Sequence, residues 1–203
     1  MSGSESVTNV LMVGVGGQGI MLASEILSGT ALLAGYDVTK SEVHGMSQRG
    51  GSVNSHVRFG PEVFSPLIPA GQAHFVVALE KLEALRWAGY LVPGGTMIVN
   101  DFRLDPATVT TGKLTYPEDV IERLKSLQDC RVRVVDGPAL SVQAGDFRTM
   151  NTVVLGALSS MLELSEEYWY KGMEERITRK NLLQINTRAF ELGRQAAQDG
   201  NRN

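Results

Sequence analysis

A glycine-rich turn near the start of the chain joins an apolar run to an amphipathic stretch. Residues 13–19 read Val-Gly-Val-Gly-Gly-Gln-Gly, after the apolar run Val10–Val13 and before Ile-Met-Leu-Ala-Ser-Glu-Ile-Leu at 20–27. Gly14, Gly16 and Gly19 fit the spacing G-x-G-x-x-G, in which missing side chains permit a tight turn and close approach of the backbone to an anion. The order strand, glycine turn, helix is typical of α/β folds, whose helix N-terminus directs N–H groups at a bound phosphate.

The rest of the chain alternates between strand-like and helix-like segments. The apolar patterns predict strands at 52–59, 75–79, 96–100 and 131–136, and helices at 18–34, 81–90, 117–127, 151–162 and within 166–198. Pro93–Gly95 and Gly137–Pro138 are interpreted as turns. The 151–162 segment is apolar almost all round, which predicts a helix buried between the sheet and another layer.

This alternation predicts an α/β fold: one Rossmann-like domain over residues 9–198, with a mostly parallel sheet, helices on both faces and a helical C-terminus. We expect residues 1–8 to be a disordered N-terminal segment and 199–203 a frayed tail. Ligands on such folds bind at the carboxyl edge of the strands, where the glycine turn would lie.

Composition excludes several function classes. The formal charge of −3, from 22 acidic and 19 basic residues, provides no strong basic field to gather nucleic acid or anionic lipid. The chain starts with a polar segment and contains no uninterrupted run of about 18 apolar residues, so we expect neither a signal peptide nor a membrane span. The expected location is the cytoplasm.

Metal chemistry is not expected on this chain. Cys130 is the single cysteine, so the chain can form no internal disulfide and cannot supply the four thiolates of an iron–sulfur cluster. Histidines at 44, 56 and 74 show no zinc-binding or dyad spacing. Cys130 is interpreted as a packed thiol at a helix-to-strand position, with a catalytic thiol as the alternative.

A second polar segment stands between the first helix and the 52–59 strand. Residues 41–52 read Ser-Glu-Val-His-Gly-Met-Ser-Gln-Arg-Gly-Gly-Ser and follow neither helical nor strand periodicity, so we expect a long loop. An arginine beside two glycines, as in Gln48–Gly51, can present a planar cation and backbone N–H groups to phosphate or carboxylate. The alternative is a solvated connection. His44 could act as an acid or base, or be an ordinary hydrogen-bonded histidine.

The sequence argues against the binding of a nicotinamide cofactor. A dinucleotide fold places an acidic residue at the end of a second strand, about 20 residues beyond the glycine turn, to hold the ribose hydroxyls. Asp37 directly follows the first helix, before any second predicted strand, and Glu42 falls inside the polar loop.

Four motifs together resemble a known family. They are the glycine turn, the string His-Gly-Met-Ser-Gln-Arg-Gly-Gly at 44–51 with its flanks, Ser-Pro-Leu-Ile-Pro at 65–69, and Asn-Thr-Val-Val-Leu-Gly-Ala at 151–157. In this order they resemble the smaller subunit of indolepyruvate:ferredoxin oxidoreductase. That subunit is equivalent to the γ subunit or domain of the pyruvate, ketoisovalerate and 2-oxoglutarate ferredoxin oxidoreductases. The 44–51 string favours the indolepyruvate branch.

The resemblance implies a subunit that is inactive alone. The family decarboxylates a 2-oxoacid oxidatively with coenzyme A, giving acyl-CoA, carbon dioxide and reduced ferredoxin. Thiamine diphosphate and 4Fe–4S clusters are held by a larger partner, which is also the route to ferredoxin. A free-standing nucleotide-binding module and a scaffolding protein are the alternatives.

We expect the glycine turn and the 44–51 loop to form one polar surface that covers the partner's thiamine site and helps to bind coenzyme A or the 2-oxoacid. Arg49 would pair with a phosphate or carboxylate, and Ser47 and Gln48 would fix its orientation. Alternatively, these residues form only the subunit interface. Asn151 caps its helix or points towards the glycine turn, and capping is the preferred interpretation. The catalytic candidates are His44, Gln48 and Arg49, and the binding candidates are Gly14, Gly16, Gly17, Gln18, Gly19, Ser47, Arg49, Gly50, Gly51 and Asn151.

Overall fold

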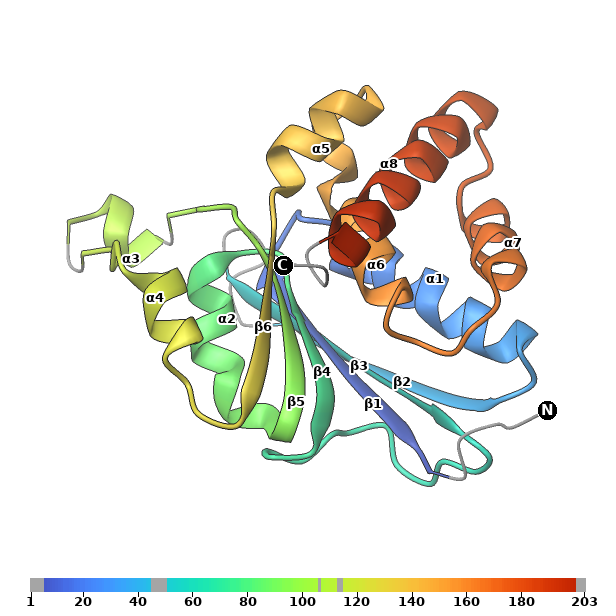
Figure 1. The fold of residues 1–203 in the computed structure, drawn as a ribbon, viewed down its shortest axis with the longest axis horizontal. Coiled ribbons are helices and arrows are strands. Elements are labelled where there is room, and N and C mark those ends of the chain that lie inside the picture. Colours follow the sequence, from blue (N-terminus) through green and yellow to red (C-terminus); the bar gives the residue numbers. More distant parts are fainter. Residues whose placement is uncertain (1–5, 45–50, 106, 113–114, 200–203) are drawn as a thin grey trace.

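The computed structural model describes residues 6–44, 51–105, 107–112 and 115–199. Strands and helices alternate along much of this part of the chain (Figure 1). The strands are β1 Thr8–Val15, β2 Asp37–His44, β3 Ser52–Gly60, β4 Ala73–Ala78, β5 Leu91–Asn100 and β6 Cys130–Val135. The α-helices are α1 Ile20–Leu33, α2 Lys81–Trp87, α3 Ala107–Thr110, α4 Val120–Lys125, α5 Gly137–Ala144, α6 Met150–Ser159, α7 Glu166–Arg176 and α8 Lys180–Asp199, with short 3-10 turns at Ala88–Tyr90 and Phe147–Thr149.

The strands form one mostly parallel sheet in the order β2-β3-β1-β4-β5-β6. β1, β4, β5 and β6 run parallel to one another, whereas β3 is antiparallel to both β1 and β2. Parallel neighbours require crossover connections, which the helices supply. The predicted α/β fold with a mostly parallel sheet is confirmed, and the antiparallel pair at one edge is an addition to it.

Helices cover both faces of the sheet, as predicted (Figure 1). Successive residues of β1 point to opposite faces. Val10 and Met12 pack in the core beneath α1, α6 and α8, while Leu11 and Val13 pack in a second core with α2 and α4. Because β1 is buried on both sides, it reads in the sequence as a continuous apolar run.

α6 lies between the sheet and α8, in agreement with its all-round apolar sequence. Val153, Val154, Leu155 and Leu158 are each at most 1 % exposed. The two helices approach closely at Gly156, where an added Cβ would collide with the backbone carbonyl of Phe190. The 151–162 prediction is therefore confirmed in its burial, and the helix itself spans Met150–Ser159.

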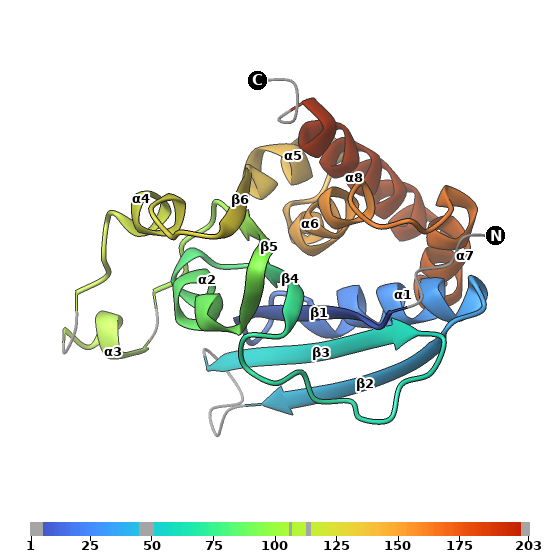
Figure 2. The same cartoon turned by 60° about the horizontal axis from the view of Figure 1, so that its bottom comes forward.

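The expectation of a loop from residue 41 was wrong. β2 starts at Asp37 and continues to His44, and it pairs along its whole length with β3 (Figure 2). Lys40 and Glu42 form an ion pair of 2.8 Å on this strand, and Glu25 of α1 lies 3.9 Å from the same ammonium group. Charged side chains take the place of the apolar residues that would have revealed a half-buried strand.

Two turn predictions also need correction. Pro93–Gly95 lies inside β5, which starts at Leu91, although the pairing of β5 with β4 shifts register near this point. Gly137 and Pro138 do end β6, but they form the first turn of α5, where proline needs no hydrogen-bonded N–H. Within the described residues, no helix has both the length and the apolar character needed to cross a bilayer.

Candidate functional site

The glycine turn lies at the carboxyl end of β1, directly before α1. Gly14 must be small because an added Cβ would lie 2.7 Å from Oε1 of Gln18 and 3.1 Å from Cβ of Leu79. Gly19 precedes the first residue of α1 with φ of 80°, a left-handed conformation that favours glycine. The first turn of a helix leaves N–H groups without intrahelical partners, so α1 directs donors away from the sheet here.

Gln18 holds this turn together from the inside. Its Oε1 accepts a hydrogen bond of 2.7 Å from the N–H of Val15, and its Nε2 donates one of 2.9 Å to the carbonyl of Leu79. Both ends of the amide are thus used by the backbone of the turn and of the residue after β4. In this structure Gln18 shapes the turn through these two hydrogen bonds, and its part in ligand binding stays a prediction.

The same carbonyl connects the turn to the next two strands. Asn100, 1 % exposed at the end of β5, donates from Nδ2 to the carbonyl of Leu79 at 3.2 Å. Its Oδ1 accepts from the N–H of Gly137 at 3.1 Å. The half-buried amide of Gln18 and the buried amide of Asn100 therefore fix the carboxyl ends of β1, β4 and β5 and the start of α5 relative to each other.

Asn151 points towards the glycine turn. Its Nδ2 donates to the carbonyl of Gly19 at 3.1 Å across the packed helices. The preferred capping interpretation was wrong, because the residue that precedes α6 is Thr149 and Asn151 lies inside the helix. The side chain instead fixes the distance between α6 and the start of α1.

The second loop ends beside the glycine turn. β2 ends at His44 and β3 starts at Ser52, which pairs with Val15. The N–H of Gly16 donates to the carbonyl of Gly51 at 3.0 Å, so the end of this loop contacts the glycine turn directly. Ser47, Gln48, Arg49 and Gly50 lie outside the described residues, as does the side chain of His44.

A buried carboxylate anchors the end of this loop to α2. Glu83 is 2 % exposed, and its Oε2 accepts from Oγ of Ser52 at 2.5 Å. Its Oε1 accepts from Arg86 at 2.7 Å, which neutralises the buried charge. Sequence reasoning did not identify Glu83, since an acidic residue in an amphipathic helix normally faces solvent.

Glu80, the residue before α2, is a second buried carboxylate. It accepts from the N–H of Glu83 at 3.0 Å and from the hydroxyl of Tyr116 at 2.6 Å. Burial of the phenol, followed by its hydrogen bond to Glu80, raises the pKa of Tyr116 far above its usual value. Glu80 thus caps α2 and holds the segment after β5 against it.

A pocket of about 260 Å³ opens directly above the glycine turn. Its floor is Gly17, Gln18 and Gly19, and one wall is Asn151 with the preceding turn. Leu182, Ile185 and Asn186 of α8 form the other wall. The pocket therefore combines the start of α1 with side chains from α6 and α8, which is the expected ligand position for this kind of sheet.

Sequence reasoning missed the one arginine among the described residues of this pocket. Arg148 is exposed and forms a two-pronged ion pair with Asp146, with distances of 2.7–3.1 Å. Hydrogen bonds from the side chain and then the backbone of Arg148 lower the pKa of Asp146 to about 2. The Asp-x-Arg pattern shortly before Asn151 is the signal that could have identified this pair.

Cys130 does not have the surroundings of an activated thiol. It is the first residue of β6, and burial, followed by the nearby charge of Asp129, raises its pKa. A reactive cysteine has a lowered pKa. Within the ranges that the structure describes, no group of three or more His, Cys, Asp or Glu side chains is placed to hold a metal ion.

Comparison with known proteins identifies the class. Residues 9–196 match the family model described as pyruvate ferredoxin/flavodoxin oxidoreductase. The chain belongs to this family, as its motifs predicted.

Relatives in this family make the assignment more specific. The chain is 39 % identical over 197 residues to indolepyruvate oxidoreductase subunit IorB of Thermococcus kodakarensis, covering 94 % of this chain and 96 % of that protein. It is 26 % identical over 148 residues to the pyruvate/ketoisovalerate oxidoreductases common subunit gamma of Thermococcus litoralis, covering 72 % and 73 %.

Solved structures share the fold. The gamma subunit of a keto/oxoacid ferredoxin oxidoreductase from Geobacter sulfurreducens gives a TM-score of 0.71 at 22 % identity, covering 95 % of this chain and 99 % of that one. A 2-oxoglutarate:ferredoxin oxidoreductase from Magnetococcus marinus gives 0.74 at 19 % identity, covering 97 % of this chain but 32 % of that one. The fold described here is thus found both as a separate subunit and as part of a longer chain.

Proposed function

We propose that this chain is the non-metal subunit of a thiamine-dependent 2-oxoacid:ferredoxin oxidoreductase, and that it lends its carboxyl-edge surface to a site on a larger partner. The observation that carries the proposal is the hydrogen bond between Gly16 and Gly51, because it brings the glycine turn and the second loop together at one edge. The higher identity to indolepyruvate subunits than to the pyruvate/ketoisovalerate subunit favours an aryl 2-oxoacid as substrate.

The single cysteine of this chain supports an assembly in which the partner holds the cofactors. Iron–sulfur clusters require several thiolates, and the chain has one cysteine, so clusters and the electron path to ferredoxin would belong to the partner. The thiamine group would supply the carbanion chemistry there. This chain can supply backbone N–H groups and guanidinium groups to bind a ligand, and a surface that forms one side of the binding site.

Coenzyme A is the co-substrate whose chemistry fits these groups. Its phosphates would accept from the N–H groups at the start of α1 and from Arg49, while Arg148 stands at the rim of the pocket above the turn. The pocket of about 260 Å³ holds a fragment of such a molecule, so the remainder would lie between this chain and the partner.

Apolar side chains beside this polar surface support a covering partner. Met21 in the first turn of α1 is 49 % exposed, and Phe147, next to Arg148, is 45 % exposed. Phe147 packs edge-on against Phe102 at 6.0 Å between ring centroids. Exposed aromatic and methionine side chains at a polar rim are typical of protein interfaces.

Replacement of Arg49 tests the binding role. In the complex reconstituted with its large subunit, Arg49→Ala should raise the KM for coenzyme A about tenfold or more and change kcat less, because one charge-assisted hydrogen bond is lost. Arg123→Ala, on the distant helix α4, is the matched control. An unchanged dependence on coenzyme A would remove Arg49 from this role, and weaker association of the subunits with unchanged kinetics would make the loop an interface only.

A nicotinamide-binding module is disfavoured by the sheet order. Glu42 lies near the end of β2, where a dinucleotide fold has its ribose-binding acid, but β3 separates β2 from β1 and its glycine turn. Titration of the isolated chain with NAD, coenzyme A and flavin distinguishes a free-standing nucleotide module from a subunit.

A further inference from the structure

A groove crosses the sheet at the edge opposite the glycine turn. α6 ends at Ser159, and residues 161–164, which lead to α7 at Glu166, border this part of the sheet. Two pockets of about 330 and 190 Å³ lie there, and both are lined by Phe75 and Met161. The two pockets adjoin at these side chains, and we call them together the lower groove.

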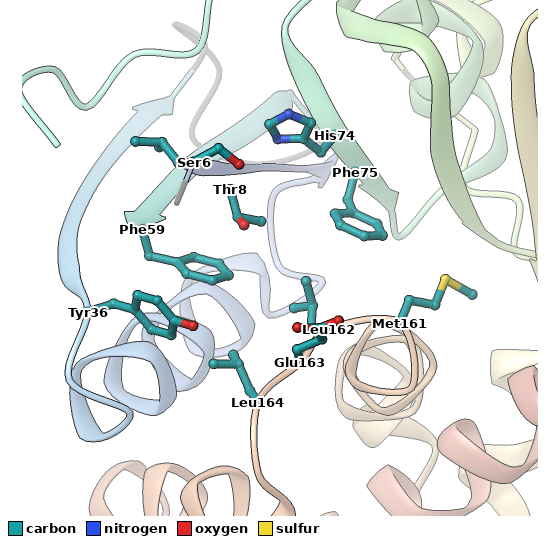
Figure 3. Close-up of a pocket in the computed structure, with 11 residues that line it drawn as sticks. Ser6, Thr8, Tyr36, Phe59, His74, Phe75, Met161, Leu162, Glu163 and Leu164 are labelled. Carbon is teal, nitrogen blue, oxygen red and sulfur yellow. The ribbon is translucent and has the colours of Figure 1, made fainter. Parts of the chain in front are cut away.

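Aromatic and aliphatic side chains form part of the wall of the larger pocket, and Ser6, Thr8, His74 and Glu163 also line it (Figure 3). Phe59 and Tyr36 pack at 5.6 Å between ring centroids on one side. Phe75 and Met161 lie on the other side, and Leu162 lies between them and Tyr36 (Figure 3). The Tyr36 hydroxyl points towards the pocket in the same view. These surfaces suit a flat or branched apolar group, since aromatic rings and methionine sulfur both pack well against such groups.

The smaller part of the lower groove is basic. Arg131 and Arg133 of β6 line it together with Thr96. The strand register fixes this arrangement, because Phe75 pairs with Thr96 and Thr96 pairs with Arg131 across three parallel strands. Alternate residues of a strand point to the same face about 6.6 Å apart, so both arginines border the same side of the groove.

The negative and positive side chains of the lower groove line different pockets. Glu163 is the one carboxylate among the described lining residues, and it lies in the turn after α6, with Phe75 and Met161 shared between its pocket and that of the arginines. Arg131 already donates to the carbonyl of Gly94 at 2.8 Å, which holds its guanidinium near the end of the groove. An anionic group would therefore be attracted to the β6 end and repelled from the other.

We propose that the lower groove binds a small amphipathic anion, with its carboxylate at Arg131 and Arg133 and its aromatic or branched body on Phe75 and Met161. Arginine suits a carboxylate because its planar fork can donate two parallel hydrogen bonds. The larger pocket, at about 330 Å³, has the size of a small-molecule site. The groove lies at the opposite edge of the sheet from the surface in the proposed function and is independent of it.

Amide NMR spectra of the full-length isolated chain test the proposal with two probes. Hydrocinnamate carries a carboxylate on a short aromatic body, and hydrocinnamamide is its neutral counterpart. We expect hydrocinnamate to shift the amide signals of Phe75, Thr96 and Arg131 saturably, and to bind about tenfold or more tightly than the amide. Equal affinities of the two probes would overturn the anion-binding role, and shifts confined to the glycine turn or no saturable shift would overturn the site.

Arginine variants locate the charge contact. The double variant Arg131→Gln, Arg133→Gln should weaken hydrocinnamate about tenfold or more and leave hydrocinnamamide unchanged, whereas the control Arg123→Gln should change neither. An undiminished affinity for hydrocinnamate in the double variant would overturn the role of the two arginines. The comparison of the two probes on the unaltered chain remains decisive if the double variant does not fold.

Discussion

Single side-chain amides do much of the positioning at the carboxyl edge. Gln18, Asn100 and Asn151 each donate to a backbone carbonyl of a different segment, so that the glycine turn is fixed to β4, β5 and α6. Polar residues beside a glycine turn look like ligand contacts in a sequence. Here their partners are backbone groups far along the chain, which no local pattern reveals.

Gln18→Met tests this structural role. Methionine has a similar length but cannot accept from the N–H of Val15 or donate to the carbonyl of Leu79. We expect a loss of about 2 kcal/mol in the free energy of unfolding, because backbone groups at a partly buried turn lose their partners. Urea denaturation measures this loss. Gln143→Met, at an exposed position of α5, is the control, and equal effects of the two changes would contradict the role of Gln18.

His56 should make stability depend on pH. Its Nδ1 accepts from the N–H of Ile68 at 3.1 Å, which requires a neutral ring. Burial, and then the charge of Arg58, lowers its pKa from 6.5. Below pH 6.5 His56 therefore binds a proton in the unfolded chain while it stays neutral in the folded chain. The free energy of unfolding falls as pH is lowered through this range.

The variant His56→Asn tests this dependence. Asparagine retains an acceptor near the position of Nδ1 and does not titrate, so unfolding free energies measured between pH 8 and pH 5 should depend less on pH than those of the unaltered chain. His74, whose pKa is lowered by the same two causes, accounts for part of the remaining slope. An unchanged slope would contradict the account.

Among the helices and strands, the sequence predicts best those that are buried on both faces, because their residues form recognisable apolar patterns. β1 and β4 are continuous apolar runs, and α1 and α6 match their predicted positions to within a few residues. β2 was missed because it is an edge strand whose ion pairs replace apolar residues. The short helix α5 was missed because Gly137–Pro138 was interpreted as a turn alone.

The candidate site, too, could be predicted from the sequence only in part. The glycine turn and its position at the carboxyl edge follow from local pattern. The contact of Glu83 with Ser52, the position of Arg148 at the pocket and the direction of Asn151 depend on segments that are distant in sequence, so they required the fold.

The contact of α6 with α8 is the element-scale feature that is easiest to test. Gly156→Ala places a Cβ against the backbone of Phe190, which cannot move aside as a flexible side chain can. We expect a net loss of about 2 kcal/mol in unfolding free energy, since the overpacking outweighs the better helix propensity of alanine.

Thermal and urea unfolding of Gly156→Ala measure this effect. Gly89→Ala is the control, because an added Cβ there meets nothing within 4 Å. Stabilisation by Gly156→Ala would show that the two helices are not packed as closely as described.

For the whole molecule, we place the proposed function at one edge of the sheet. The glycine turn, the ends of the 44–51 loop and the pocket beneath Arg148 meet there, with exposed Met21 and Phe147 beside them. Such a surface can position a ligand, but with a single cysteine the chain cannot pass electrons onwards through an iron–sulfur cluster. We therefore infer that activity belongs to an assembly in which this chain forms one side of the ligand-binding site.

The most direct measurement is reduction of viologen by purified subunits supplied with an aryl 2-oxoacid and coenzyme A. The chain should be assayed alone, beside its co-expressed large thiamine-dependent subunit alone, and in the complex of the two. We expect turnover by the complex and none by this chain alone. Turnover by the isolated chain, or a large subunit that is equally active without it, would show that this chain is not a required non-metal subunit.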